Sequence, residues 1–294
     1  MTPLELVQLP ALMAVTSGSE DITIALLDGP VVFDHPDLLS ERIQDIAWGV
    51  SGRCSDASSS ACQHGTFVAA ILSAHRGSAA PAICPGCNLL VRPIFPEKIA
   101  EGELLPQATA QQLAAAISEC IAAGARVLNL SAAMGSPSTR DERELRDVLD
   151  HAARRGVLMV AAAGNQGALG SSAITRHPWV IPVVGYGLNG RPMVQSNLGS
   201  SMGRRGLGAP GEEVTSLSPQ GQLRTLAGTS FATAFVTGAI ALLWSIFPAA
   251  TAIEVKHATT NTCLQRRTSI VPPLLDAWAA YQILSRTQPR RVTA

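Results

Sequence analysis

The stretch that decides the fold runs from Leu226 to Phe247 and reads LAGTSFATAFVTGAIALLWSIF. Gly228, Thr229 and Ser230 come first, and residues 231–247 after them carry no charged side chain. A helix that is apolar on every side must be buried, and a serine in its first turn places its hydroxyl at the positive end of the helix dipole. The pattern predicts a central buried helix that fixes Ser230 as a nucleophile.

Two other interpretations of this stretch are open. Ser230 is only an N-cap in the first, because Gly-Thr-Ser before an apolar run is common capping chemistry. The second is a transmembrane span, since the run is near the lower limit of the roughly 17–25 apolar residues that a bilayer requires. No Lys or Arg flanks it closely, the nearest being Arg224 and Lys256. We therefore expect a core helix.

Composition indicates one well-packed domain. The chain has 294 residues, of which 47% are hydrophobic and 15% charged, with a mean hydropathy of +0.22, which suffices to bury a large core. Lys and Arg number 22, and so do Asp and Glu. A net charge of zero implies neither a basic face for nucleic acid nor an acidic coat.

The N-terminus does not have the features of a secretory signal. It contains Glu5 and two prolines before residue 21 and lacks a cationic start, so we expect cytoplasmic residence. The segment 1–20 is interpreted as a short N-terminal extension.

The six cysteines are too few for a disulfide scaffold in a chain of this size. Cys84 and Cys87 have CxxC spacing, but a tetrahedral zinc site needs a second pair, which the scattered cysteines and histidines do not supply. A local disulfide is favoured over zinc, either Cys54 to Cys62 or Cys84 to Cys87. A reducing cytosol would act against both bonds.

Short apolar runs alternate with longer helical patterns along the chain. Strands are predicted at 22–27, 88–95, 125–130, 157–163, about 180–185 and 206–218, and helices at 63–72, 107–123, 140–155, 251–258 and 274–284 besides the apolar one. This alternation predicts right-handed crossovers and an α/β, three-layer fold, with a mostly parallel central sheet flanked by helices on both faces. We expect one domain over 21–285 and a C-terminal tail at 286–294.

Polar residues of the types that take part in catalysis stand at the ends of these elements. Asp28 follows the first strand, Gly164 and Asn165 follow the strand at 157–163, and His64 opens a helix. The carboxyl ends of parallel strands are where α/β sheets place their active sites. Taken singly, Asp28 equally suits a turn, and a lone histidine such as His64 is more often a cap or a surface residue.

Together the four local strings resemble the subtilisin-like serine proteases over roughly residues 20–285. The order is Asp, His, then Ser, and the strings are Asp28-Gly29, His64-Gly65-Thr66-Phe67-Val68-Ala69, Ala162-Ala163-Gly164-Asn165 and Gly228-Thr229-Ser230-Phe231-Ala232-Thr233-Ala234.

The resemblance implies a role for each of these residues. Ser230 would attack the scissile carbonyl, His64 would take and return the proton, and Asp28 would orient His64. Asn165 would bind the oxyanion together with the Ser230 N–H. Gly164 and the segment Ser131-Ala132-Ala133 would bind an extended peptide. No cofactor and no metal are implied.

The chain departs from the family pattern in three places. Ala234 stands where the family usually has proline. The loop at 73–80 lacks the carboxylate and amide oxygens with which many relatives hold calcium. The segment before the first strand is far shorter than the folding pro-segment of secreted relatives.

Within the family, short motifs resemble the proteases that remove leaders during maturation of cyanobactins, which are ribosomally made, modified peptides. These motifs are Leu27-Asp28-Gly29-Pro30-Val31, His35-Pro36, Pro93-Ile94-Phe95 and Gly208-Ala209-Pro210-Gly211-Glu212. We therefore expect a monomeric endopeptidase that cuts a precursor peptide bound in extended form, with no nucleic-acid or membrane partner. The alternatives are a general intracellular subtilisin of protein turnover and a pseudoprotease that binds peptides without cutting them.

Overall fold

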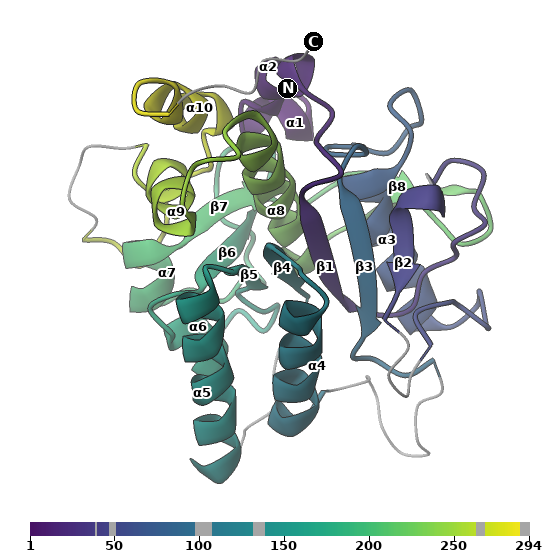
Figure 1. The fold of residues 1–294 in the computed structure, drawn as a ribbon, viewed down its shortest axis with the longest axis horizontal. Helices are drawn as coiled ribbons and strands as arrows, with labels where there is room; N and C mark the ends of the chain where they lie inside the picture. Colours follow the sequence, from purple (N-terminus) through teal and green to yellow (C-terminus); the bar gives the residue numbers. More distant parts are fainter. Residues whose placement is uncertain (39, 47–50, 98–107, 132–138, 263–267, 289–294) are drawn as a thin grey trace.

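The computed structural model describes residues 1–294 except 39, 47–50, 98–107, 132–138, 263–267 and 289–294. Its centre is a seven-stranded sheet in the order β2-β3-β1-β4-β5-β6-β7, and every neighbouring pair is parallel (Figure 1). The strands are β1 (Thr23–Asp28), β2 (Ile43–Asp45), β3 (Asn88–Pro93), β4 (Val127–Leu130), β5 (Leu158–Ala162), β6 (Ile181–Tyr186) and β7 (Leu207–Pro210). The α/β fold class predicted from the sequence is confirmed.

Helices cover both faces of the sheet because successive strand residues point to opposite sides. Ile24 and Leu26 of β1 face the larger core, which contains α2 (Leu9–Val15), α3 (Ser60–Ser73), α8 (Thr229–Ile246), α9 (Ala252–Thr260) and α10 (Ala277–Ser285). Ala25 and Leu27 face the second core, with α4 (Ala110–Ala122) and α5 (Thr139–Arg155). The sheet is thus the middle of three layers.

Helix α8 is the central helix that the opening stretch predicts. All of its residues are buried, and it packs on β4, β5, β6 and β7 and beside α3. It is the one described helix whose length and composition would suit a membrane span, but the fold encloses it completely. Burial in protein accounts for its apolar surface.

Most predicted elements differ from the structure by one to three residues at an end, and one such difference moves a site residue. Helix α3 begins at Ser60, three residues earlier than predicted, because the Ser59 hydroxyl caps it by accepting the Cys62 N–H at 3.1 Å. His64 therefore lies in the second turn, not the first.

The single strand predicted at 206–218 is in fact two strands. β7 ends at Pro210, and Glu213, directly before β8 (Val214–Leu217), adopts a left-handed φ of 52° that interrupts the extended chain. Strand β8 pairs with β9 (Leu223–Leu226) in a separate antiparallel sheet.

Several short elements were not predicted. The N-terminal extension folds into α1 (Pro3–Leu6) and α2, and α2 buries Leu9 and Leu12 against α8 and α10. The polar stretch 34–62 contains η1 (Ser40–Arg42) and β2. The last two are α6 (Ala173–Arg176) and α7 (Ser200–Arg205).

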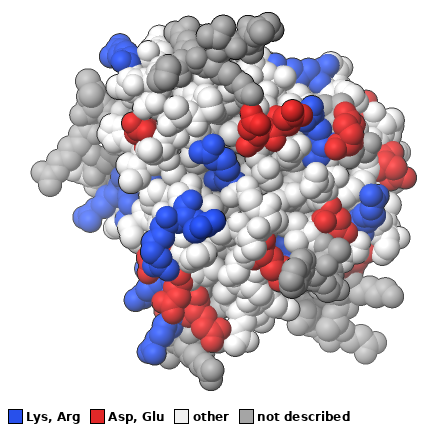
Figure 2. Space-filling view, in the orientation of Figure 1, with Lys and Arg blue, Asp and Glu red and all other residues white. Residues whose placement is uncertain are grey.

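The described charged residues form no large area of one sign on the face seen in Figure 2. Lys and Arg side chains lie next to Asp and Glu across it, in line with the net charge of zero. The described part of this face therefore has no continuous basic surface of the kind on which nucleic-acid binding depends.

Candidate active site

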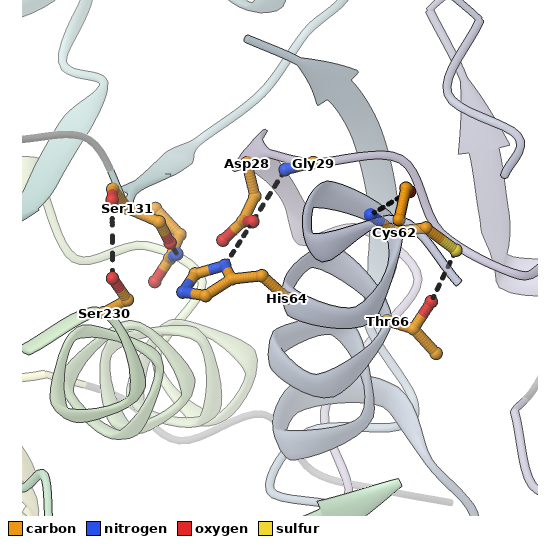
Figure 3. Close-up of polar contacts among 9 residues, drawn as sticks. Asp28, Gly29, Cys62, His64, Thr66, Ser131 and Ser230 are labelled. Atoms are coloured by element: carbon orange, nitrogen blue, oxygen red, sulfur yellow. Dashed lines mark hydrogen bonds and ion pairs between the residues drawn. The ribbon is translucent and has the colours of Figure 1, made fainter. Parts of the chain in front are cut away.

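Asp28 and His64 form a direct pair at the carboxyl end of the central strand β1. Asp28 is completely buried, and its Oδ1 lies 2.6 Å from His64 Nδ1 and accepts the Gly29 N–H at 2.6 Å (Figure 3). The His64 side chain keeps 30% of its surface exposed. The carboxylate therefore fixes one ring nitrogen, and the other remains available to the surface.

Two glycines allow α3 to approach β1 closely enough for this pair. A methyl group on Gly29 would overlap the Ala61 carbonyl, and one on Gly65 would overlap the Gly29 carbonyl. The strings Asp28-Gly29 and His64-Gly65 thus provide the close backbone contact as well as the reacting side chains.

The environment tunes the basicity of His64. Burial of the ring by itself lowers its pKa. The charge of Asp28 and the hydrogen bond to it together raise the pKa by more than burial lowers it, so the net shift is upward from 6.5. An imidazole that is stabilised when protonated is suited to take a proton from a neighbouring hydroxyl.

Ser230 is the second residue of α8, and its side chain does not cap the helix. The N-cap is Gly228, and no side-chain hydrogen bond caps this end, so the capping interpretation is wrong. The Ser230 hydroxyl donates to the Ser131 carbonyl at 3.4 Å, a weak bond. Figure 3 shows the His64 ring between Asp28 and Ser230.

Asn165 reaches the same place from the end of β5. Its Oδ1 accepts the Thr229 N–H at 2.9 Å, which holds the amide against the first turn of α8. The Nδ2 end of the amide is not used in this bond. Gly164 turns the chain with φ 105° and donates its N–H to the Thr229 hydroxyl at 3.2 Å. A bond made by the Ser230 N–H is not found among the described residues, as expected for a free donor in the first helical turn.

Comparison with known proteins identifies the family of this chain. The family model described as the Subtilase family matches residues 19–285. The chain belongs to the subtilase family. Subtilisin amylosacchariticus of Bacillus subtilis subsp. amylosacchariticus is 27% identical over 258 residues, which are 87% of this chain and 64% of that protein. The chain thus spans about 64% of the length of the first curated subtilisins it matches.

Two solved subtilase structures are similar over almost the whole chain. The protease domain of PatA, the patellamide maturation protease, is 28% identical with a TM-score of 0.79, covering 92% of this chain and 97% of that one. The prenylagaramide maturation protease PagA is also 28% identical with a TM-score of 0.79, covering 94% and 98%.

The predicted peptide-binding residues of this subtilase are placed in part. Ser131 follows β4 and is buried, with its carbonyl directed at Ser230 (Figure 3). Gly164 also contacts the first turn of α8, through its bond to the Thr229 hydroxyl. Ala132 and Ala133 lie outside the described residues.

Sequence reasoning missed two polar residues that support Ser131. Asn129, completely buried in β4, donates from Nδ2 to the Ser131 hydroxyl at 3.3 Å. Its Oδ1 accepts the hydroxyl of buried Thr237 in α8 at 2.8 Å. An Asn inside an apolar strand and a Thr inside an apolar helix were the available signals, because buried polar groups need partners.

Five of the six cysteines of the subtilase chain lie among the described residues. Cys54 and Cys62 form a disulfide with a Cα–Cα distance of 5.6 Å, whereas Cys84 and Cys87 are free and buried. The hydrogen bond between those two thiols raises the pKa of Cys84 and lowers that of Cys87. Cys54, Cys62 and Glu97 have ligand atoms within 4.8 Å of one another, but two sulfurs joined in a disulfide are not thiolate ligands.

Proposed function

We propose that the chain is a serine endopeptidase with Ser230 as nucleophile, His64 as general base and acid, and Asp28 as the residue that orients His64. The observation that carries this proposal is the His64 ring, which is bound at Nδ1 by buried Asp28. The ring also lies at the Ser230 end of α8, with its centroid 5.4 Å from that of Phe231. Asn165 Nδ2 and the Ser230 N–H are the proposed oxyanion donors.

The reaction proceeds in two proton-balanced halves. Ser230 Oγ adds to the carbonyl carbon while its proton passes to His64, and the same proton is then given to the departing amine as the C–N bond breaks. Water next loses a proton to His64 and adds to the acyl group, and that proton returns to Ser230 Oγ as the carboxylate product forms. Asp28 remains ionised and stabilises the imidazolium between these transfers.

We propose further that the bond cut is in a precursor peptide, at the end of its leader. Support comes from the 28% identity to the maturation proteases PatA and PagA over nearly the full chain. The substrate would lie extended beside Ser131 and Gly164, gaining main-chain hydrogen bonds first and specificity from side-chain pockets second.

The experiment presents the purified chain with each short peptide encoded beside its gene as a candidate precursor, and mass spectrometry identifies the products. One cut at the leader junction, absent with Ser230→Ala, is expected. Extensive digestion of unrelated unfolded proteins at a similar rate would favour general turnover instead. Failure of a fluorophosphonate to label Ser230 would favour the pseudoprotease and contradict the enzyme.

A further inference from the structure

The loop that carries Asn165 has no regular secondary structure of its own. Residues 163–168 follow β5, and Asn165 itself is exposed. An oxyanion donor is effective only when its position is set before the reaction, because a preorganised donor costs no reorganisation in the transition state. Something outside the loop must therefore fix its shape.

The side chain of Asn197 makes four hydrogen bonds to this loop. Oδ1 accepts the N–H groups of Gln166 at 3.1 Å and Ala168 at 2.9 Å. Nδ2 donates to the Ala163 carbonyl at 3.1 Å and to Gln166 Oε1 at 2.7 Å. Two accepted and two donated bonds use the full capacity of an amide.

The main chain of Asn197 adds a fifth bond, from its N–H to the Gly164 carbonyl at 2.9 Å. The space is tight as well, because a Cβ on Gly164 would collide with Asn197 Nδ2. Residues on both sides of Asn165 are thus bound by Asn197, while Asn165 is left to bind the first turn of α8.

From this arrangement we infer that Asn197 is a positioning residue for the oxyanion donor Asn165. It does not contact the reacting atoms, and its effect on the reaction passes through Asn165. The inference rests on the serine protease chemistry of the proposed function and not on the identity of the peptide substrate.

The test is a double-mutant cycle on a p-nitrophenyl ester, whose acyl transfer also forms an oxyanion. Asn197→Ala should lower kcat at least about 10-fold with little change in KM, and by no more than the roughly 10²–10³-fold that loss of an oxyanion donor costs. In an Asn165→Ala background the same substitution should change kcat less than about 2-fold, because the group it positions is gone.

Asn189→Ala is the matched control. Asn189 is also a loop asparagine between β6 and α7, and its Oδ1 accepts one backbone N–H, from Arg191 at 2.9 Å. It should leave kcat unchanged. If Asn197→Ala does not fold, Asn197→Asp, which keeps the volume and both accepted bonds, takes its place in the cycle.

Two results would overturn the inference. Equal fold-losses in the wild-type and Asn165→Ala backgrounds would show that Asn197 acts only through general stability, and an unchanged kcat would show that the loop needs no such anchor. If the wild-type chain does not hydrolyse the ester but a fluorophosphonate still labels Ser230, the cycle is measured as the rate of that labelling. The phosphoryl oxygen of the label occupies the same oxyanion hole, so the same two results apply. Absence of both reactions would contradict the proposed function itself.

Discussion

At the scale of single residues, the environment of Ser230 predicts that its hydroxyl serves chemistry and not stability. The hydroxyl makes one 3.4 Å bond and does not cap α8, so Ser230→Ala should cost less than about 1 kcal/mol of unfolding free energy. Hydrolysis should be lost. Thermal unfolding and ester turnover check both halves, and more than a few per cent residual kcat would refute the assignment of Ser230.

His64→Ala should abolish hydrolysis equally, because residues of a triad act as a unit. It differs from Ser230→Ala in stability. Removing the imidazole leaves the buried carboxylate of Asp28 without its partner, so this variant should unfold at clearly lower denaturant concentration. Equal denaturation midpoints for the two variants would contradict the importance of the Asp28–His64 pair.

The pH dependence of the reaction follows from the raised pKa of His64. The base must be neutral, so kcat/KM should rise with pH through a midpoint above 6.5, the ordinary value. In Asp28→Asn the charge that raises the pKa is gone while burial still lowers it, so the midpoint should move to lower pH and the plateau should fall. A midpoint that moved upward would contradict this electrostatic account.

The stability carried by this pair has the opposite pH dependence. Because the pKa of His64 is raised in the folded chain, the pair stabilises the fold fully at pH values below the unfolded pKa, and this contribution is lost as pH rises through the folded pKa. The pair therefore contributes most to stability at low pH, whereas activity is highest at high pH.

At the scale of elements, Arg76 explains how the loop at 73–80 is fastened. Its guanidinium donates to the carbonyls of Met13, Thr16 and Ile83, which joins the end of α2 to the turn before β3. These are bonds from a fixed positive charge to backbone oxygens. A protein cation thus binds the N-terminal extension to this loop.

We predict that excess chelator leaves the thermal midpoint unchanged, because the loop offers hydroxyls and carbonyls but no carboxylate for calcium. A drop of many degrees on chelation would reveal a calcium site outside this loop.

Arg76→Ala should lower the free energy of unfolding by about 1–2 kcal/mol, a value already reduced for the exposure of the side chain. Arg191→Ala, in an exposed loop, is the control.

The disulfide between Cys54 and Cys62 joins the loop after β2 to the first turn of α3. This bond does not agree with the expected cytoplasmic residence, because disulfides rarely persist in reducing compartments. Because of this bond, the oxidised chain should show two fewer alkylatable thiols when unfolded than the same chain after reduction. Six thiols in protein alkylated at cell lysis would show the bond absent in the cell.

At the scale of the whole molecule, the exposure of the described site residues predicts hydrolysis and not ring closure. Ring formation requires the acyl-enzyme to survive until the substrate's own amine arrives, so water must be excluded. His64 is 30% exposed, and Asn165 is exposed too. Only 36 positions separate Asp28 from His64, and the described part of that interval contains η1, β2 and the start of α3, with no helical hairpin.

Water at about 55 M should therefore capture the acyl group before a tethered amine does. Mass spectrometry of the precursor digest is the measurement, and linear fragments that gain the mass of water are expected. Ser230→Ala is the blank. A cyclic peptide as the main product would contradict the prediction and require a cover over the site.

The sequence by itself predicted the α/β class and the buried helix α8, and its family motifs grouped Asp28, His64, Asn165 and Ser230 as one candidate site. His64 lies one turn later in its helix than predicted. Strong periodicity over long segments, together with polar residues at element ends, carries that information locally. It also limited the disulfide to two pairs of cysteines, but it did not choose between them.

Tertiary structure alone decided the rest. Strand β2 exists because β3 offers it a partner, and α2 is stable because α8 and α10 bury Leu9 and Leu12, so neither has a local signal. The choice of Cys54 and Cys62 depends on Cα atoms brought to 5.6 Å. The five bonds of Asn197 join segments about thirty residues apart, as their separations of 29 to 34 positions show, and only packing of the finished sheet places such segments side by side.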